Sequence, residues 1–123
     1  LFMSLLLVSA CGGASEPEEL ELPISLRWGW EGNVELERMI PKRINVLQGD
    51  MVTLKIDTDN VGTLHFHGYD IKVDVSPEQV SEVYFVAEAT GKFEVTFHGI
   101  VGYKDNTSEE AETHMGYVQV KPR

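Results

Sequence analysis

The stretch VLQGDMVTLKIDTDNVGTLHFHGYDIKVDV, residues 46–75, decides the fold class. Within it, Val52, Leu54 and Ile56 alternate with polar residues, and this alternation is typical of a strand with one buried face. A Gly-Asp pair stands before this run and an Asn-Val-Gly sequence follows it, and both favour turns. The stretch therefore predicts short strands that are joined by tight turns.

The same period of two continues on both sides of this stretch. Seven or eight such segments, separated by turn residues at regular spacing, predict an all-β sandwich or barrel. No segment has the 3.6-residue period of a long helix, and a length of 123 residues leaves room for one domain. The further apolar faces are Ile24, Leu26, Trp28 and Trp30 in one segment, Val83, Phe85 and Ala87 in another, and Phe93, Val95 and Phe97 in a third.

The first 22 residues differ in composition from the rest. Residues 1–10, LFMSLLLVSA, are apolar but too short to span a bilayer, and they predict the remnant of a signal peptide. Residues 11–22, CGGASEPEELEL, are small and acidic and predict a tether. The folded domain is expected over residues 23–123. Cys11 is the only cysteine, so the chain cannot form an internal disulfide.

The overall charge limits the class of partner. Ten Lys and Arg residues against twenty Asp and Glu residues give a formal net charge of −10. Such a surface repels nucleic acid and attracts cations, including metal ions. We therefore expect no nucleic-acid partner.

Four histidines are the candidate metal ligands, namely His65, His67, His98 and His114. They lie at expected strand ends that are far apart in sequence, so only the fold can bring them together. His65 and His67 share one face of an extended strand. His98 points away from the face that Phe97 shares, so it can reach the site only if the strand ends or twists at Gly99. Neutral imidazole suits Cu(II), Zn(II) and Ni(II), and Cu(II) binds most tightly. The alternative is that the histidines are hydrogen-bonded structural groups.

Most of residues 40–122 resembles the cupredoxins, through the segments HFHGYD, GKFEVTFH and HMGYVQV. The resemblance implies a Greek-key β-sandwich, with His65 at the first ligand position in NVGTLH. It also implies that Phe97 stands near the place of the family's cysteine ligand, and His114 at the axial place. Met115 falls one residue later. A blue-copper site needs a thiolate, and residues 23–123 contain none.

A second resemblance concerns the N-terminal region. LVSAC, which ends at Cys11, is similar to the lipobox of bacterial lipoproteins. It implies cleavage before Cys11 and a lipid on its sulfur. The mature protein would then be anchored in the cell envelope, on the periplasmic or the outer side.

Three classes of function follow from these observations. The first is a lipid-anchored cupredoxin-like protein that binds a copper ion through histidines, and the alternative is a metal-free module that binds an envelope protein. Residues 104–114 would then be a loop that offers Asp105 or Glu112 to a cation. The third class is an enzyme. No nucleophile–base pair or phosphate-binding loop is recognisable, so the expectation is that the chain is not an enzyme.

Overall fold

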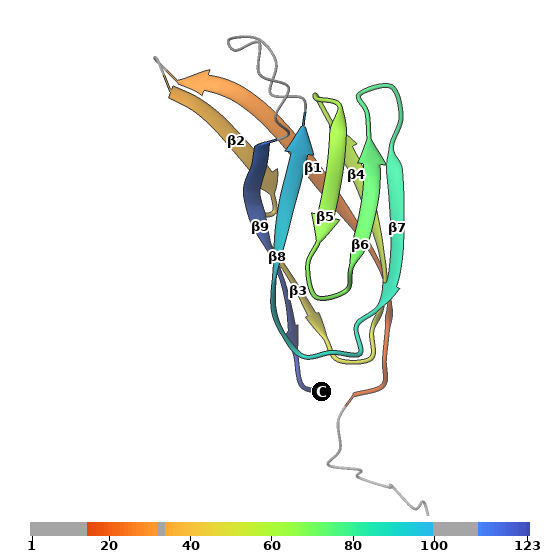
Figure 1. Cartoon of the computed structure of the whole chain (residues 1–123). Coiled ribbons are helices and arrows are strands. Elements are labelled where there is room, and N and C mark those ends of the chain that lie inside the picture. The colour runs from red at the N-terminus through yellow and green to blue at the C-terminus, as the bar shows by residue number, and fades with distance from the viewer. Residues whose placement is uncertain (1–14, 32–33, 100–110) are drawn as a thin grey trace, which may run out of the picture.

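Two β-sheets packed face to face make up the fold in the part of the chain that the structure describes. This computed structural model describes residues 15–31, 34–99 and 111–123, and these residues form nine strands and no helix (Figure 1). The strands are β1 (Glu19–Glu31), β2 (Val34–Ile40), β3 (Arg43–Leu47), β4 (Met51–Thr58), β5 (Gly62–Phe66), β6 (Ile71–Val75), β7 (Ser81–Val86), β8 (Gly91–Gly99) and β9 (Ala111–Lys121).

Most consecutive strands lie in different sheets, but β1-β2, β5-β6 and β8-β9 are each paired within one sheet. One sheet has the order β2-β1-β4-β7, and the other has the order β3-β9-β8-β5-β6. β1 runs parallel to β4 and β3 runs parallel to β9, whereas the other pairs are antiparallel. The expected all-β sandwich is therefore confirmed. In the five-stranded sheet, β8 is the central strand and lies between β9 and β5 (Figure 1).

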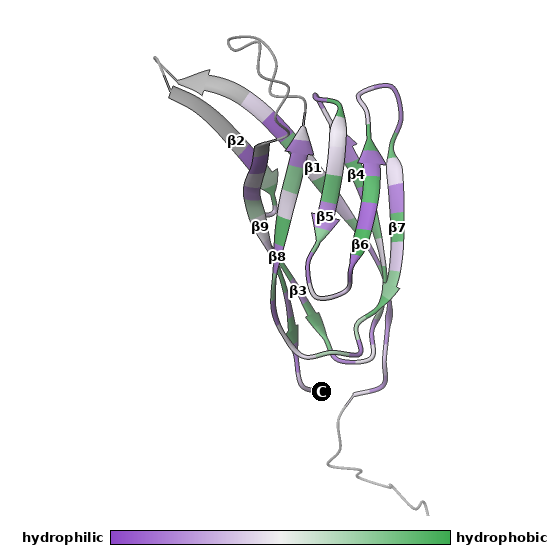
Figure 2. Ribbon diagram, viewed as in Figure 1, coloured by the Kyte–Doolittle hydropathy of each residue, from purple (hydrophilic) through white to green (hydrophobic). Residues whose placement is uncertain are grey.

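The core lies between the sheets and comes from alternate residues of each strand. β4 shows the pattern most clearly, because its even-numbered residues from Val52 to Thr58 are all buried. Hydrophobic and hydrophilic bands alternate along β5 and β6 in Figure 2. The alternation fixes the register of each strand, since a slip of one residue would turn the apolar side chains to water. The buried apolar set includes Ile24, Leu26, Leu54, Ile56, Leu64, Phe66, Val95, Phe97, Val118 and Val120.

The structure differs from the sequence prediction in two places. β2 was not predicted, although it pairs with β1 in an antiparallel hairpin from Ser25↔Ile40 to Glu31↔Val34. β1 also begins at Glu19, so residues 19–22 of the expected tether pair with β4. Acidic residues concealed this part of the strand because they lie on its outer side, while Leu20 and Leu22 pack against the core.

Two groups of sequence predictions lie outside the described residues. They are the signal peptide and lipid site over residues 1–14, and the loop residues up to 110, which include Asp105. In the part that the structure does describe, no helix has the length and the apolar composition needed to cross a bilayer.

Candidate metal centre

The four histidines lie on one surface, the outer face of the β3-β9-β8-β5-β6 sheet. In β5, Leu64 and Phe66 point into the core, so His65 points outward. In β8, the buried Phe97 is followed by the outward His98. The prediction that His98 points away from the Phe97 face is confirmed. His65 also lies on this outer face, so His98 needs no twist in the strand to approach it.

The pairing register places these side chains in adjacent rows. His65 pairs with Thr96, and Thr63 pairs with His98, across β5 and β8. Across β8 and β9, Thr96 pairs with His114 and His98 pairs with Glu112. Polar side chains from three neighbouring strands therefore lie side by side on the outer face.

A β-bulge in β9 brings Glu112 and His114 to this face. Val95 pairs with Gly116 but Thr96 pairs with His114, so Met115 is an extra residue in β9. Without it, the alternation set by the inward Val118 and Val120 would turn His114 and Glu112 into the core. Gly116, next to the bulge, leaves room for the Lys42 carbonyl oxygen, which a Cβ at that position would overlap.

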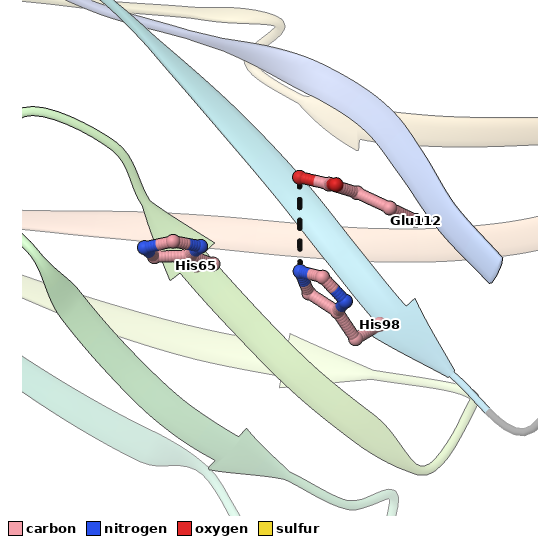
Figure 3. Close-up of side chains that lie close together, drawn as sticks. All are labelled: His65, His98 and Glu112. Atoms are coloured by element: carbon pink, nitrogen blue, oxygen red, sulfur yellow. Dashed lines mark ion pairs between the residues drawn. The ribbon is translucent and has the colours of Figure 1, made fainter. Parts of the chain in front are cut away.

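Three of the outer side chains form a compact group of possible ligands. One ligand atom each from His65, His98 and Glu112 lies within 4.8 Å of the other two. The His98 Nε2 atom is 3.7 Å from the Glu112 Oε1 atom. Figure 3 shows that the three side chains come from β5, β8 and β9 in turn and converge above the sheet. Glu112 therefore belongs to a strand, not to the loop that the sequence predicted.

His67 lies beside this group, and it contacts the carboxylate. Its ring centroid is 4.0 Å from that of His65, which confirms that the two share a face. The His67 Nε2 atom lies 2.9 Å from the Thr96 hydroxyl oxygen and 3.1 Å from Glu112 Oε1. Thr96 is only 2% exposed although it faces outward, because the cluster covers it.

Hydrogen bonds to Glu112 favour its ionised form. The Thr96 hydroxyl, followed by the His67 imidazole and the nearby His98, holds the pKa of Glu112 below its ordinary value, although partial desolvation acts in the opposite direction. The carboxylate is therefore charged at neutral pH and available to a cation.

His114 has different neighbours from the other three histidines. Its Nδ1 atom lies 3.2 Å from Glu94 Oε1, and its ring centroid lies 4.7 Å from that of Tyr117. His65 has a carboxylate neighbour of its own, because its Nε2 atom lies 3.6 Å from Asp70 Oδ1. Asp70, Glu94 and Thr96 were not predicted from the sequence, although strand alternation from His98 places Glu94 and Thr96 on its face.

The inner side of the same strands holds no comparable set of donors among the described residues. Phe97 fills the interior, where its ring packs on Trp28 with centroids 4.6 Å apart. Gly62 makes room for this ring, because a Cβ at that position would lie 2.3 Å from Phe97 Cζ. Met115 is buried in the core at 3% exposure, so its sulfur lies on the side of the sheet opposite the histidines.

The donor set determines which metals fit. Two imidazoles and one carboxylate are ligands that suit Cu(II), Zn(II) and other divalent first-row metals, and Cu(II) is usually bound most tightly. The group contains no thiolate, so it cannot form the trigonal His₂Cys set of a blue-copper site. The residues present therefore fit a non-blue copper ion or a zinc ion.

Comparisons with known proteins give matches among solved structures. A scan of protein-family models and a search of curated proteins find no match for this chain. The blue copper oxidase from Nitrosomonas europaea aligns over 86% of this chain with a TM-score of 0.60 and 21% sequence identity. The multicopper oxidase mgLAC aligns over 86% with a TM-score of 0.57 and 16% identity. The multi-copper oxidase from Pseudomonas thermotolerans aligns over 88% of this chain with a TM-score of 0.58 and 14% identity.

These matches support a statement about the fold. The fold is cupredoxin-like, as the sequence predicted, and it is shared with domains of copper oxidases. The chain spans 39% of the length of each of the first two oxidases and 31% of the third. At identities this low, the shared fold does not transfer an activity or a set of ligands.

The comparisons correct the prediction that the chain is not an enzyme. The three solved structures named above are oxidases, which are enzymes. A missing nucleophile–base pair and a missing phosphate loop therefore do not exclude catalysis, because neither feature is needed for metal-based oxidation. The expectation that the chain is not an enzyme is therefore withdrawn.

Proposed function

We propose that this chain is a cupredoxin-like domain that binds one copper ion through His65, His98 and Glu112. The observation that carries the proposal is the convergence of three ligand atoms, within 4.8 Å of one another, from three different strands. Copper is preferred to zinc on the general order of affinities for nitrogen and oxygen ligands. Without a thiolate, the site serves metal binding and handling in place of blue-copper electron transfer.

A titration of the full chain with Cu(II), followed by electron paramagnetic resonance, tests this proposal. We expect one tight equivalent with a tetragonal nitrogen-ligand spectrum. His65→Ala should abolish tight binding, and His114→Ala is the matched control because its imidazole contacts Glu94 and lies outside the group of three. Equal losses in both variants would extend the site to His114. Unchanged binding in His65→Ala would overturn the proposal.

The cellular setting that we propose rests on sequence alone. LVSAC supports lipid attachment at Cys11, and the apolar residues before it support export to the cell envelope. Cells that express the complete protein with labelled fatty acid should yield labelled protein, and Cys11→Ser should remove the label. An unlabelled wild-type protein would contradict lipidation.

A metal-free module that binds an envelope protein is the second candidate. It is favoured by the contacts that the histidines already make within the chain. His67 lies 3.1 Å from the Glu112 carboxylate and His114 lies 3.2 Å from that of Glu94. His98 lies 3.7 Å from the Glu112 carboxylate. A network that is satisfied in this way stabilises the sheet without an ion. Absence of stoichiometric binding of either Cu(II) or reduced Cu(I) would support this candidate.

A further inference from the structure

The three candidate ligands approach from one side only. They are His65 on β5, His98 on β8 and Glu112 on β9, which are neighbouring strands of one sheet. Because all three leave the same face, an ion that they bind has the sheet on one side (Figure 3). Their side chains are 16%, 28% and 48% exposed, in that order. Each of the three side chains is therefore partly accessible to water.

Three protein ligands leave the coordination of a divalent metal incomplete. Structural zinc sites use four protein ligands, whereas sites with three keep a position for water or another small ligand. Cu(II) in tetragonal surroundings likewise needs at least four ligands. Among the described residues, the group of mutually close donors contains no fourth member.

The nearest additional imidazole is already engaged. The His67 Nε2 atom lies within 3.1 Å of both the Thr96 hydroxyl and the Glu112 carboxylate. In this position it orients the carboxylate, in the way that neighbouring groups orient metal ligands. His114 is held in the same manner by Glu94. Neither imidazole is placed to close the open side.

The charge of the site favours an anion at the open position. Two neutral imidazoles and one carboxylate leave a divalent ion with one net positive charge. An anion neutralises this charge, whereas water does not. Among the described residues, the carboxylates that oppose this are Asp70 near His65, Glu94 near His114, and Asp74, which accepts a hydrogen bond from Thr63 opposite His98. Asp70 is 92% exposed, so water screens its charge.

We infer that a metal ion at this site keeps one solvent-facing coordination position, where a small anion exchanges with water. The inference rests on the proposed binding of metal by His65, His98 and Glu112. It gives the site a ligand class of its own, small anions with nitrogen or oxygen donor atoms. The same fold carrying a fully enclosed site would not bind such anions.

The test is a titration with azide of the full chain loaded with one equivalent of Cu(II). We expect an azide-to-copper charge-transfer band and a changed paramagnetic resonance spectrum, both saturating at one azide per copper and reversing on dialysis. Copper that binds tightly but does not respond to azide would overturn the inference and leave the proposed function intact. Failure of copper to bind would overturn both.

His67→Ala tests whether His67 fills the open position. If His67 only orients Glu112, the variant should bind copper more weakly, but once saturated with one copper it should show an azide band, as the wild type does. If His67 is the fourth ligand of the loaded protein, only the variant will respond. That result would overturn the inference and assign His67 to the metal. Relaxation of water protons by the copper, reduced when azide is added, gives an independent measure of the exchangeable position.

Discussion

In β5 and β8, adjacent residues point to opposite faces of the sheet, and the two faces have different surroundings. Leu64, Phe66 and Phe97 face the other sheet and are buried in the core. Their immediate neighbours His65, His67 and His98 face outward and contact one another or a carboxylate. Because a strand alternates its side chains, the stability of the core and the proposed metal binding fall on alternate positions. A substitution on one face should therefore leave the property of the other face largely unchanged.

The largest effect is expected on the inner face, from Phe97→Ala. The substitution removes a buried ring together with its contact to Trp28, and changes of this kind cost about 3–5 kcal/mol of unfolding free energy. Denaturation by urea measures the loss. Phe97→Leu is the control, with an expected cost below about 1.5 kcal/mol. A loss below about 1 kcal/mol for Phe97→Ala would show that the two faces are less distinct than the burial indicates.

The second effect is expected on the outer face, from His98→Ala. Removing one of three ligands should lower copper affinity by more than about 100-fold, which exceeds the usual effect of losing a group that only orients a ligand. The unfolding free energy of the metal-free protein should change by at most about 1 kcal/mol, because the side chain is partly exposed. Isothermal titration and urea denaturation measure the two quantities. A large loss of stability with unchanged affinity would reverse the assignment of the faces.

A smaller effect is expected from Thr96→Val, which preserves shape and removes the hydroxyl. Thr96 contacts His67 and lowers the pKa of Glu112 by hydrogen bonding. We expect copper affinity to fall by about tenfold, the lower end of the range for groups that orient ligands.

The paramagnetic resonance spectrum separates this role from a structural one. It should change in Thr96→Val and recover in Thr96→Ser, which restores the hydroxyl. Thr53→Val, on the outer face of the other sheet, is the control and should leave affinity unchanged. Equal effects of Thr96→Val and Thr53→Val would show that the hydroxyl does not position the site.

The sequence predicted the fold because its signal is local. Alternation in residues 46–75 gave both the strands and the shared face of His65 and His67, and the same rule placed His98 opposite Phe97. These inferences need only the geometry of a single strand. Of the three candidate ligands, this rule predicts the outward direction of His65 on β5 and His98 on β8, but not that of Glu112.

The position of Glu112 and His114 could not be derived in the same way. Counting back from Val118 and Val120 places both inside, and the extra residue at Met115 reverses this result. A bulge depends on the register with the partner strand, here β8, which is a tertiary contact. β2 was missed for a related reason, because its pairing with β1 is not visible in its own residues.

The smallest effect is expected from a charged pair on the outer face of the other sheet. This pair tests whether the side chains of an outer face contribute to the free energy of unfolding. Arg27 donates a hydrogen bond of 2.7 Å to Asp57, and both side chains are nearly half exposed. Hydrogen bonds from Ser25 and then from Arg27 hold the pKa of Asp57 below its ordinary value. Water screens such a pair, so Asp57→Asn should cost at most about 1 kcal/mol of unfolding free energy at pH 7.

The pH dependence of that difference tests its origin. Because the folded-state pKa of Asp57 is the lower one, its contribution to stability is complete above the unfolded-state pKa of about 4 and is lost as the pH falls further. Urea denaturation of wild type and Asp57→Asn should therefore give curves that differ at pH 7 and converge below about pH 4. A difference in unfolding free energy that stays constant with pH would show that Asp57 acts through packing and not through its charge. The outer face of this sheet would then stabilise the fold in the same way as an inner face does.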